Sequence, residues 1–323
     1  MVEISEEFIE QLKNYFHKLT TDYLISFYGE QKGKLLIAKY DYAFQEFYEK
    51  NLRVMPTNLS KRHGINAIFV LALDKALEEE KLDHEQFKEH ILAIYQMMTQ
   101  SIIDAQIKRL EESEDPWRTF VEDAKKGNTL LYDNKYFEGI VAYDVEGCFG
   151  IDIQECLYFE ILSKNKRPDL GPILCAYDSL LANAIERWFT FERNRTIADG
   201  WSYCDFRYYS KESPRKQEIE EEKKKLFPIV LDFVHKETGW GNPLKPQCEY
   251  DDLFLRGILN IDANKILVRF TYQFDEDGFS MYDKNHILKG ELILDSERKI
   301  LSFKLEETYT GPGCVEDPYK TKL

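Results

Sequence analysis

The chain has 323 residues, which is enough for about two domains of average size. Hydrophobic residues make up 43% and aromatic residues 14% of it, a composition that excludes an intrinsically disordered chain. The net charge of −15 argues against general nucleic-acid binding, because an acidic surface repels the phosphate backbone.

The sequence also lacks the marks of a membrane or secreted protein. No apolar run approaches the ~20 residues of a membrane-spanning helix, and the acidic start of the chain is unlike a signal peptide. We therefore expect a cytoplasmic protein without a membrane partner, whose six cysteines are reduced thiols. No Cys-x-x-Cys pair is present, so a zinc ribbon has little support.

The first part of the chain has helical periodicity. Ser5 is a predicted N-cap, and Asp83 with Gln86 forms a predicted capping box. The predicted helices cover residues 5–28, 34–51, 60–80, 83–110 and 117–125. Four histidines are spread over this region without metal-ligand spacing, and we expect surface or packing roles for them: His17, His63, His84 and His90.

From residue 136 the apolar period changes to the alternation of a strand. The pattern predicts strands over 137–145 and 148–153, then a helix over 154–163. Pro172 opens a short helix that contains Cys175 and Asp178.

After residue 209 the composition shifts. Ser213-Pro214 is a predicted helix start, and Pro228 is expected to kink or restart that helix, which continues through residue 234. A turn-rich linker over 239–246 leads to four strands at hairpin spacing, with an irregular tail from Gly311; the strands cover 253–261, 266–274, 287–294 and 300–307.

These elements predict an α+β fold. An N-terminal helical bundle leads into a small α+β unit with a β-hairpin, and a separate C-terminal helix plus a four-stranded antiparallel sheet follows. The predicted domains are residues 1–212 and 213–323.

The stretch over residues 191–208 carries the densest set of reactive side chains. Apolar and aromatic residues flank Asp199-Gly200, which predicts a hairpin with a two-residue type I′ turn and cross-strand partners that sum to 399. The opposed residues are then Arg195 and Cys204, Arg193 and Phe206, Glu192 and Arg207, and Asn194 and Asp205. A shift of one residue would exchange the two faces.

This register has a chemical consequence. A guanidinium beside Cys204 favours the nucleophilic thiolate, and two arginines suit a carboxylate-bearing substrate. The alternatives are a Cys204 that is only a small buried apolar residue and arginines that only form surface ion pairs.

Residues ~137–209 resemble the L-2-amino-thiazoline-4-carboxylic acid hydrolase family. The matching elements are Cys156, Cys175-Ala-Tyr-Asp178, Phe191-x-Arg193, Thr196-Ile-Ala-Asp-Gly200 and Cys204-Asp-Phe-Arg207. The resemblance implies a hydrolase that acts on C–N bonds of a cyclic amidine and opens 2-aminothiazoline-4-carboxylate to N-carbamoyl-cysteine.

The implied site uses cysteine and aspartate. Cys204 or Cys175 would attack as a thiolate, and Asp205 or Asp178 would hold the amidinium or act as general base. The implied substrate-binding residues are Arg193, Arg207, Thr196 and Cys156. No histidine lies between residues 91 and 234, so a Cys–His pair would require one supplied by the fold.

Other hypotheses stay open at this point. We expect no cofactor and no metal, although Cys156, Cys175, Cys204 and an aspartate form an alternative zinc site. The expected partner is a small molecule with a carboxylate, and the C-terminal domain has a possible protein partner. A non-catalytic small-molecule-binding or sensory protein is the main alternative, and an interaction protein whose cysteines are all core residues is a third.

Overall fold

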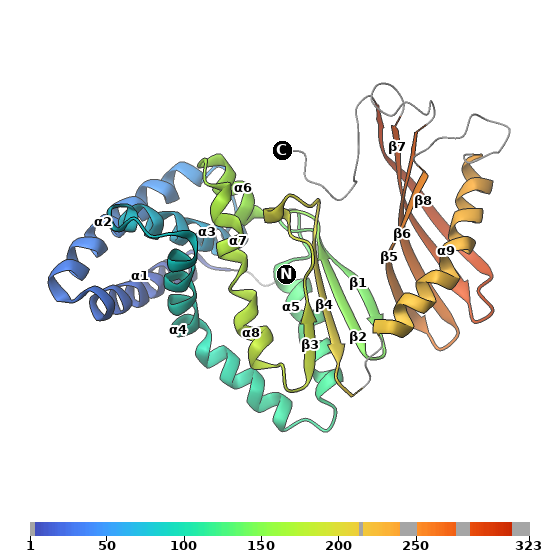
Figure 1. Cartoon of the computed structure of the whole chain (residues 1–323), viewed down its shortest axis with the longest axis horizontal. Coiled ribbons are helices and arrows are strands. Elements are labelled where there is room, and N and C mark those ends of the chain that lie inside the picture. Colours follow the sequence, from blue (N-terminus) through green and yellow to red (C-terminus); the bar gives the residue numbers. More distant parts are fainter. Residues whose placement is uncertain (1–3, 213–215, 240–250, 276–284, 312–323) are drawn as a thin grey trace. The chain divides into compact units, whose positions relative to one another are not determined.

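The computed structural model describes residues 4–212, 216–239, 251–275 and 285–311, and it divides the chain into two compact units (Figure 1). Unit 1 takes residues up to 139, 153–187 and 195–200, and unit 2 takes residues 140–152, 188–194 and those from 201 on. Both units are therefore assembled from several stretches of chain. The domain boundary expected at residue 213 stays a prediction.

Unit 1 is helical. Its helices are α1 (Glu6–Tyr28), α2 (Glu30–Asn51), α3 (Asn58–Leu77), α4 (His84–Glu111), α5 (Pro116–Leu131), α6 (Leu157–Lys164), α7 (Gly171–Cys175) and α8 (Asp178–Ala184). Unit 1 also has short 3-10 turns: η1 (Glu78–Glu80) after α3, η2 (Pro168–Leu170) after α6, and η3 (Ile197–Asp199).

Side-chain caps start the helices where the sequence predicted them. The Ser5 hydroxyl accepts a hydrogen bond from the Phe8 amide, and Asp83 forms the expected capping box with Gln86. Each cap satisfies amide groups that the first helical turn leaves without a partner.

α3 forms the centre of unit 1. It packs against α1, α2, α6 and α7, and its middle residues Ile65, Ile68 and Phe69 are fully buried. A helix that is apolar on all sides must be surrounded by protein, and α3 meets that requirement.

Unit 2 is built on one mixed sheet. Its strands are β1 (Gly139–Val145), β2 (Cys148–Ile153), β3 (Phe189–Glu192), β4 (Cys204–Ser210), β5 (Asp251–Asp262), β6 (Lys265–Asp275), β7 (Asn285–Asp295) and β8 (Ile300–Gly311). They follow the order β3-β4-β2-β1-β5-β6-β7-β8 as one eight-stranded sheet (Figure 1).

The α+β class and the four antiparallel C-terminal strands are thus confirmed, whereas their separation from the earlier strands is not. β1 pairs in parallel with β5, with Tyr143 opposite Ile258 and Asp144 opposite Leu259. Nothing local marks a pairing between residues so distant in sequence, so the continuity of the sheet emerges only in three dimensions.

Helix α9 (Lys216–Thr238) supplies the core on one face of this sheet. Its buried residues Leu226, Val230 and Phe233 belong to one apolar cluster with Phe270 and Leu292 of the strands. α9 runs through Pro228 as a single helix, so the expected restart does not occur.

The hairpin is partly as predicted. β3 and β4 pair in the expected register, with Glu192 opposite Arg207. The two-residue turn is wrong, because β3 ends at Glu192 and β4 begins only at Cys204. Arg195 consequently lies in the connecting segment and not in a strand opposite Cys204.

A local cap explains the longer loop. The Thr196 hydroxyl accepts a hydrogen bond from the Asp199 amide and starts η3, which Gly200 ends with a left-handed φ of 93°. A threonine that bonds to nearby backbone offers the chain an alternative to strand pairing. Asp199 therefore belongs to a 3-10 turn and not to a type I′ turn.

Several expectations lie outside the described residues. These are the Ser213-Pro214 helix start, most of the linker over 239–246, the tail beyond residue 311, and Cys248 and Cys314.

Gly290 gives a direct test of packing in unit 2. A Cβ at this position would lie 2.0 Å from Cζ of Phe270, its cross-strand neighbour, and that ring is fully enclosed. We expect Gly290→Ala to lower the free energy of unfolding by about 1–3 kcal/mol, because it overpacks this site. Urea denaturation measures the change.

Gly127 is the matched control. It lies in α5 and a Cβ there would meet nothing within 4 Å, so Gly127→Ala should be neutral or stabilise by roughly 0.5–1 kcal/mol. Equal effects of the two substitutions would contradict the packing described for Phe270.

Candidate functional site

Unit 1 gathers three of the predicted site residues. Cys156 is the N-cap of α6, Cys175 ends α7, and Asp178 begins α8. Burial raises the pKa of the Cys156 thiol, and Cys175 and Asp178, which lie three residues apart at the α7–α8 junction, add to the rise. The helices bring them together because α6 packs against α7.

Four tyrosines surround this group, from α4, α6, the end of α5 and the α7–α8 junction. They are Tyr95, Tyr132, Tyr158 and Tyr177. The Tyr95 and Tyr177 rings stack, with centroids 5.1 Å apart, and the Tyr95 hydroxyl donates to Oδ1 of Asn66 at 3.1 Å. We call Cys156, Cys175, Asp178 and the four tyrosines the tyrosine cluster.

The electrostatics of the tyrosine cluster keep its hydroxyls neutral. Burial is the main cause that raises the pKa of Tyr95, Tyr132 and Tyr158. The neighbouring Tyr132 is the main cause for Tyr177, and the Asp178 charge adds to the rise for Tyr95, Tyr132 and Tyr177. A neutral phenol can donate one hydrogen bond, and that of Tyr95 goes to Asn66, so Tyr132 and Tyr177 are the neutral phenols near the Asp178 carboxylate.

His63 joins the tyrosine cluster from α3. Its Nδ1 lies 3.0 Å from the Tyr158 hydroxyl, and its ring contacts the rings of Tyr132 and Tyr158. Burial, together with the adjacent Arg62 cation, lowers the pKa of His63 to about 3. The imidazole is therefore neutral at physiological pH, and the expected packing role becomes a polar one.

Cys156 is a thiol and not a thiolate. Burial raises its pKa to about 12, and Cys175 adds to this, although the amides of Phe159 and Tyr158 oppose the rise. Its Sγ accepts from the Phe159 amide at 3.5 Å, which starts α6. Cys156 is thus a poor nucleophile, and its expected substrate-binding role stays a prediction.

Water nevertheless reaches the tyrosine cluster. Cys156, Cys175, Tyr177 and Asp178 are all partly exposed, whereas Tyr95 behind them is 1% exposed. Groups that protein surrounds and solvent still reaches are available to a small polar molecule.

Residues 62–208 match the model of the L-2-amino-thiazoline-4-carboxylic acid hydrolase family. We call this part of the chain the hydrolase-family segment. It confirms the resemblance expected over ~137–209 and extends it to α3, so that it begins at Arg62, directly before His63. Neither the search of curated proteins nor the search of solved structures returned a match.

The remaining predicted site residues divide between a turn of unit 1 and the sheet of unit 2. Thr196 is buried, and its hydroxyl donates to Oδ2 of Asp199 at 2.6 Å, so this side chain holds η3. Cys204 is buried at the start of β4, and Asp205 beside it accepts from the Asn194 amide at 2.8 Å.

The two arginines of unit 2 differ. The Arg193 guanidinium lies 5.7 Å from the centroid of the Phe206 ring, near the partner that the register predicted. Arg207 donates to Oδ1 of Asp152 at 2.6 Å and lies over the ring of Tyr143. Because Arg256 also donates to Asp152, at 3.3 Å, Arg207 belongs to a buried ionic network within the sheet.

Sequence reasoning missed part of the tyrosine cluster. Tyr158 and Tyr177 lie two residues after Cys156 and Cys175, respectively, so this shared spacing was a usable signal. Arg62 and His63 carried no such signal, because only the packing of α3 against α6 brings them to residues almost a hundred positions later. The alternative zinc site is not formed by the described residues, which include no group of three suitable ligands.

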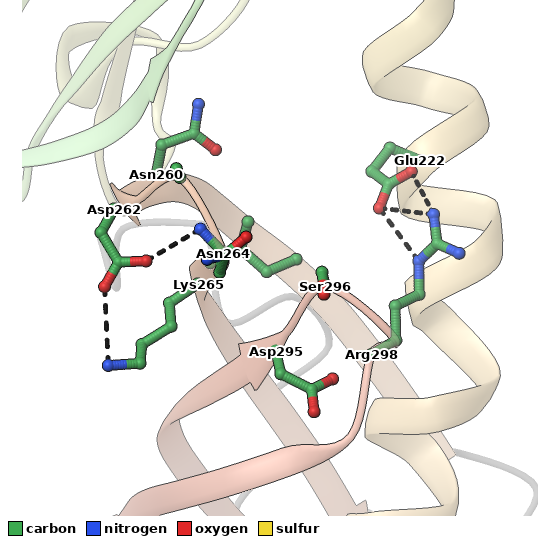
Figure 2. A pocket seen from close by; sticks show the side chains of 10 residues that line it. Glu222, Asn260, Asp262, Asn264, Lys265, Asp295, Ser296 and Arg298 are labelled. Atoms are coloured by element: carbon green, nitrogen blue, oxygen red, sulfur yellow. Dashed lines mark hydrogen bonds and ion pairs between the residues drawn. The ribbon is translucent and has the colours of Figure 1, made fainter.

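A pocket of unit 2 lies at the ends of two hairpins. Figure 2 shows this pocket of about 420 Å³ beside the turns after β5 and β7. Its cations are already paired, Arg298 with Glu222 at 2.8 Å and Lys265 with Asp262 at 3.5 Å. None of the predicted site residues lines it.

The described helices include none that is both long and apolar enough to span a membrane.

The environment of His63 predicts a pH dependence of stability. Its pKa is about 3 in the folded protein and about 6.5 when unfolded, so between these values only the unfolded chain binds the proton. The contribution of neutral His63 to the free energy of unfolding is therefore full above pH 6.5. It is lost on acidification, and the free energy of unfolding then falls by at most about 1.4 kcal/mol per pH unit.

We expect His63→Gln to flatten this part of the profile, measured by urea denaturation between pH 7.5 and 4.5. His17→Gln is the control, since His17 is exposed and pairs with Asp41 on the surface. An unchanged slope in His63→Gln would show that the buried imidazole is not the group responsible.

Proposed function

We propose that the protein is a hydrolase that opens a cyclic amidine such as 2-aminothiazoline-4-carboxylate to N-carbamoyl-cysteine. The observation that carries the proposal is the grouping of Cys175 and Asp178 with neutral tyrosine hydroxyls inside the hydrolase-family segment. A thiol, a carboxylate and hydrogen-bond donors are the groups that this reaction needs.

The reaction consumes one water. Attack at the amidine carbon by a thiolate opens the ring, the ring sulfur leaves as a thiol, and an isothiouronium adduct on the enzyme remains. Water then adds to the same carbon and the enzyme sulfur departs, leaving a carbamoyl group. Because the product keeps both nitrogens on that carbon, the ring bond that breaks is C–S, although the C–N amidine is the group attacked.

Cys175 is the nucleophile in this proposal. Its neighbour Cys156 is held as a thiol by burial, which leaves Cys175 as the candidate within the tyrosine cluster. Asp178 would hold the positive amidinium, and the tyrosine hydroxyls would donate to groups that gain negative charge. His63 is too weak a base for the proton transfer, so we assign it the positioning of Tyr158.

The substrate carboxylate needs a cation, and Arg62 supplies one beside the tyrosine cluster, with Nη1 3.5 Å from Nε2 of His63. Its charge lowers the pKa of Tyr132 and of Tyr158 against the dominant effect of burial, so it lies near both hydroxyls. Arg207 is engaged with Asp152 in unit 2, which weakens its original assignment. Arg193, which belongs to unit 2 with Cys204 and Asp205, stays the anchor expected for a centre at those residues. Thr196 supports the segment of unit 1 that contacts α7 through η3.

The second candidate centre is Cys204 with Asp205. This centre lies in unit 2 and offers the same thiol and carboxylate for the reaction. Substitutions of Cys175 and of Cys204 distinguish the two centres. If neither centre is catalytic, a ligand that binds without turnover would favour the alternative of a small-molecule-binding protein.

We expect Cys175→Ala and Asp178→Asn each to lower kcat for 2-aminothiazoline-4-carboxylate by about 10²-fold or more. The reaction is measured by the free thiol that ring opening releases. Cys148→Ala is the matched control, because burial raises the pKa of that thiol to about 12 within the core of unit 2. Full activity in Cys175→Ala with loss in Cys204→Ala would move the nucleophile to β4.

We expect Arg62→Gln to raise KM about tenfold or more with a smaller effect on kcat, since it removes one charge-assisted contact. The parent should also prefer the substrate over 2-aminothiazoline without the carboxylate, and Arg62→Gln should lose that preference. Arg118→Gln, an exposed arginine of α5 paired with Glu122, serves as control. A preference retained in Arg62→Gln would contradict the assignment of the carboxylate to Arg62.

A further inference from the structure

Strand β8 ends the described sheet and offers an unusual edge. It is 12 residues long, contains no proline, and pairs only with β7 in the described strand order. Irregular pairing at Leu301 and near residue 308 leaves the stretch 302–307 as a regular strand between them. Long, regular edges are rare in isolated proteins because they invite pairing with another strand.

Apolar side chains line this edge on the side of α9. Leu301 and Phe303 are each 51% exposed, and Phe227 of α9 is 41% exposed. Leu301 and Phe303 line a groove of about 890 Å³ between α9 and β8. In this groove the centroids of the Phe303 and Phe233 rings lie 4.9 Å apart. Apolar surface beside an open strand edge is typical of a protein–protein contact.

The occupant that we consider is a second copy of the chain, because its strand β8 has the same known sequence and the fit of the two strands can be examined residue by residue. Two copies related by a two-fold axis perpendicular to the sheet pair antiparallel and keep the same faces. Opposed residues of 302–307 must then both be even or both be odd, because side chains alternate between the faces. Only a few registers remain.

Charge selects among these registers. An axis at Leu305 places Lys304 of each copy opposite Glu306 of the other, which forms two ion pairs. An axis at Lys304 or at Glu306 would instead oppose identical charges. Within one strand Lys304 Nζ lies 3.9 Å from Oε2 of Glu306, and both side chains are exposed, at 73% and 64%, so this surface pair can be exchanged for pairs between the copies. Opposite charges across strands stabilise a pairing and like charges oppose it.

We propose that β8 pairs with β8 of a second copy, antiparallel about Leu305, so that the two sheets join into one. On the face beside α9 the pairing sets Leu305 against Leu305 and Phe303 against Glu307, and it places Lys304 and Glu306 on the opposite face. The proposal is independent of the hydrolase activity, since none of the tyrosine cluster takes part.

Sedimentation of the full-length protein over a micromolar concentration series tests the association. We expect a monomer–dimer equilibrium that Lys304→Glu weakens about tenfold, because both cross-strand pairs become repulsive. Lys304→Glu combined with Glu306→Lys exchanges the charges and should restore the dimer. A parent that stays monomeric, or a double variant no better than Lys304→Glu, overturns the proposal.

Cross-linking tests the register. Under mild oxidation Leu305→Cys should form a disulfide-linked dimer beyond the background of the parent, because the axis brings the two copies of residue 305 together. Phe303→Cys is the matched control, since its thiols meet only in the rival register centred on Phe303. A linked dimer with Phe303→Cys and none with Leu305→Cys overturns the pairing about Leu305.

Discussion

The burial of α3 is the constraint on which unit 1 depends. Its apolar middle residues require neighbours on every side, and α1, α2, α6 and α7 supply them. That packing fixes the N-terminal turn of α3 beside α6, so His63 reaches the Tyr158 hydroxyl across a long stretch of sequence. The polar contacts of the candidate site are thus a consequence of hydrophobic packing, with Cys156, Cys175 and Asp178 held on the short helices around α3.

The same burial sets the chemistry of the tyrosine cluster. Desolvation opposes charge, so it keeps the Cys156 thiol and His63 neutral and holds protons on the tyrosine hydroxyls. Asp178 reinforces the neutral phenols around it. The Asp178 carboxylate suits a cationic amidine, and neutral hydroxyl donors suit groups that gain negative charge.

Unit 2 follows a different rule, in which backbone pairing dominates. The parallel contact of β1 with β5 joins strands that the sequence places in separate regions, and α9 buries one face of the C-terminal strands. Arg207, Asp152 and Arg256 form an ionic network inside this unit, which accounts for a conspicuous arginine of the motif in structural terms. The sheet that results is closed on one face by α9 and has an exposed apolar margin at β8.

Local patterns in the sequence determined the helices, their caps, the C-terminal strands and even the β3–β4 register, because each depends on neighbouring residues or on a two-residue period. They also determined the hydrolase-family motifs, including Cys175 and Asp178. Tertiary structure decided the rest. The Thr196 cap replaced the tight turn, and β1 paired in parallel with β5. The packing of α3 brought His63 and Arg62 to the tyrosines. These outcomes depend on contacts between residues far apart in the chain, and no local periodicity records which distant surfaces meet.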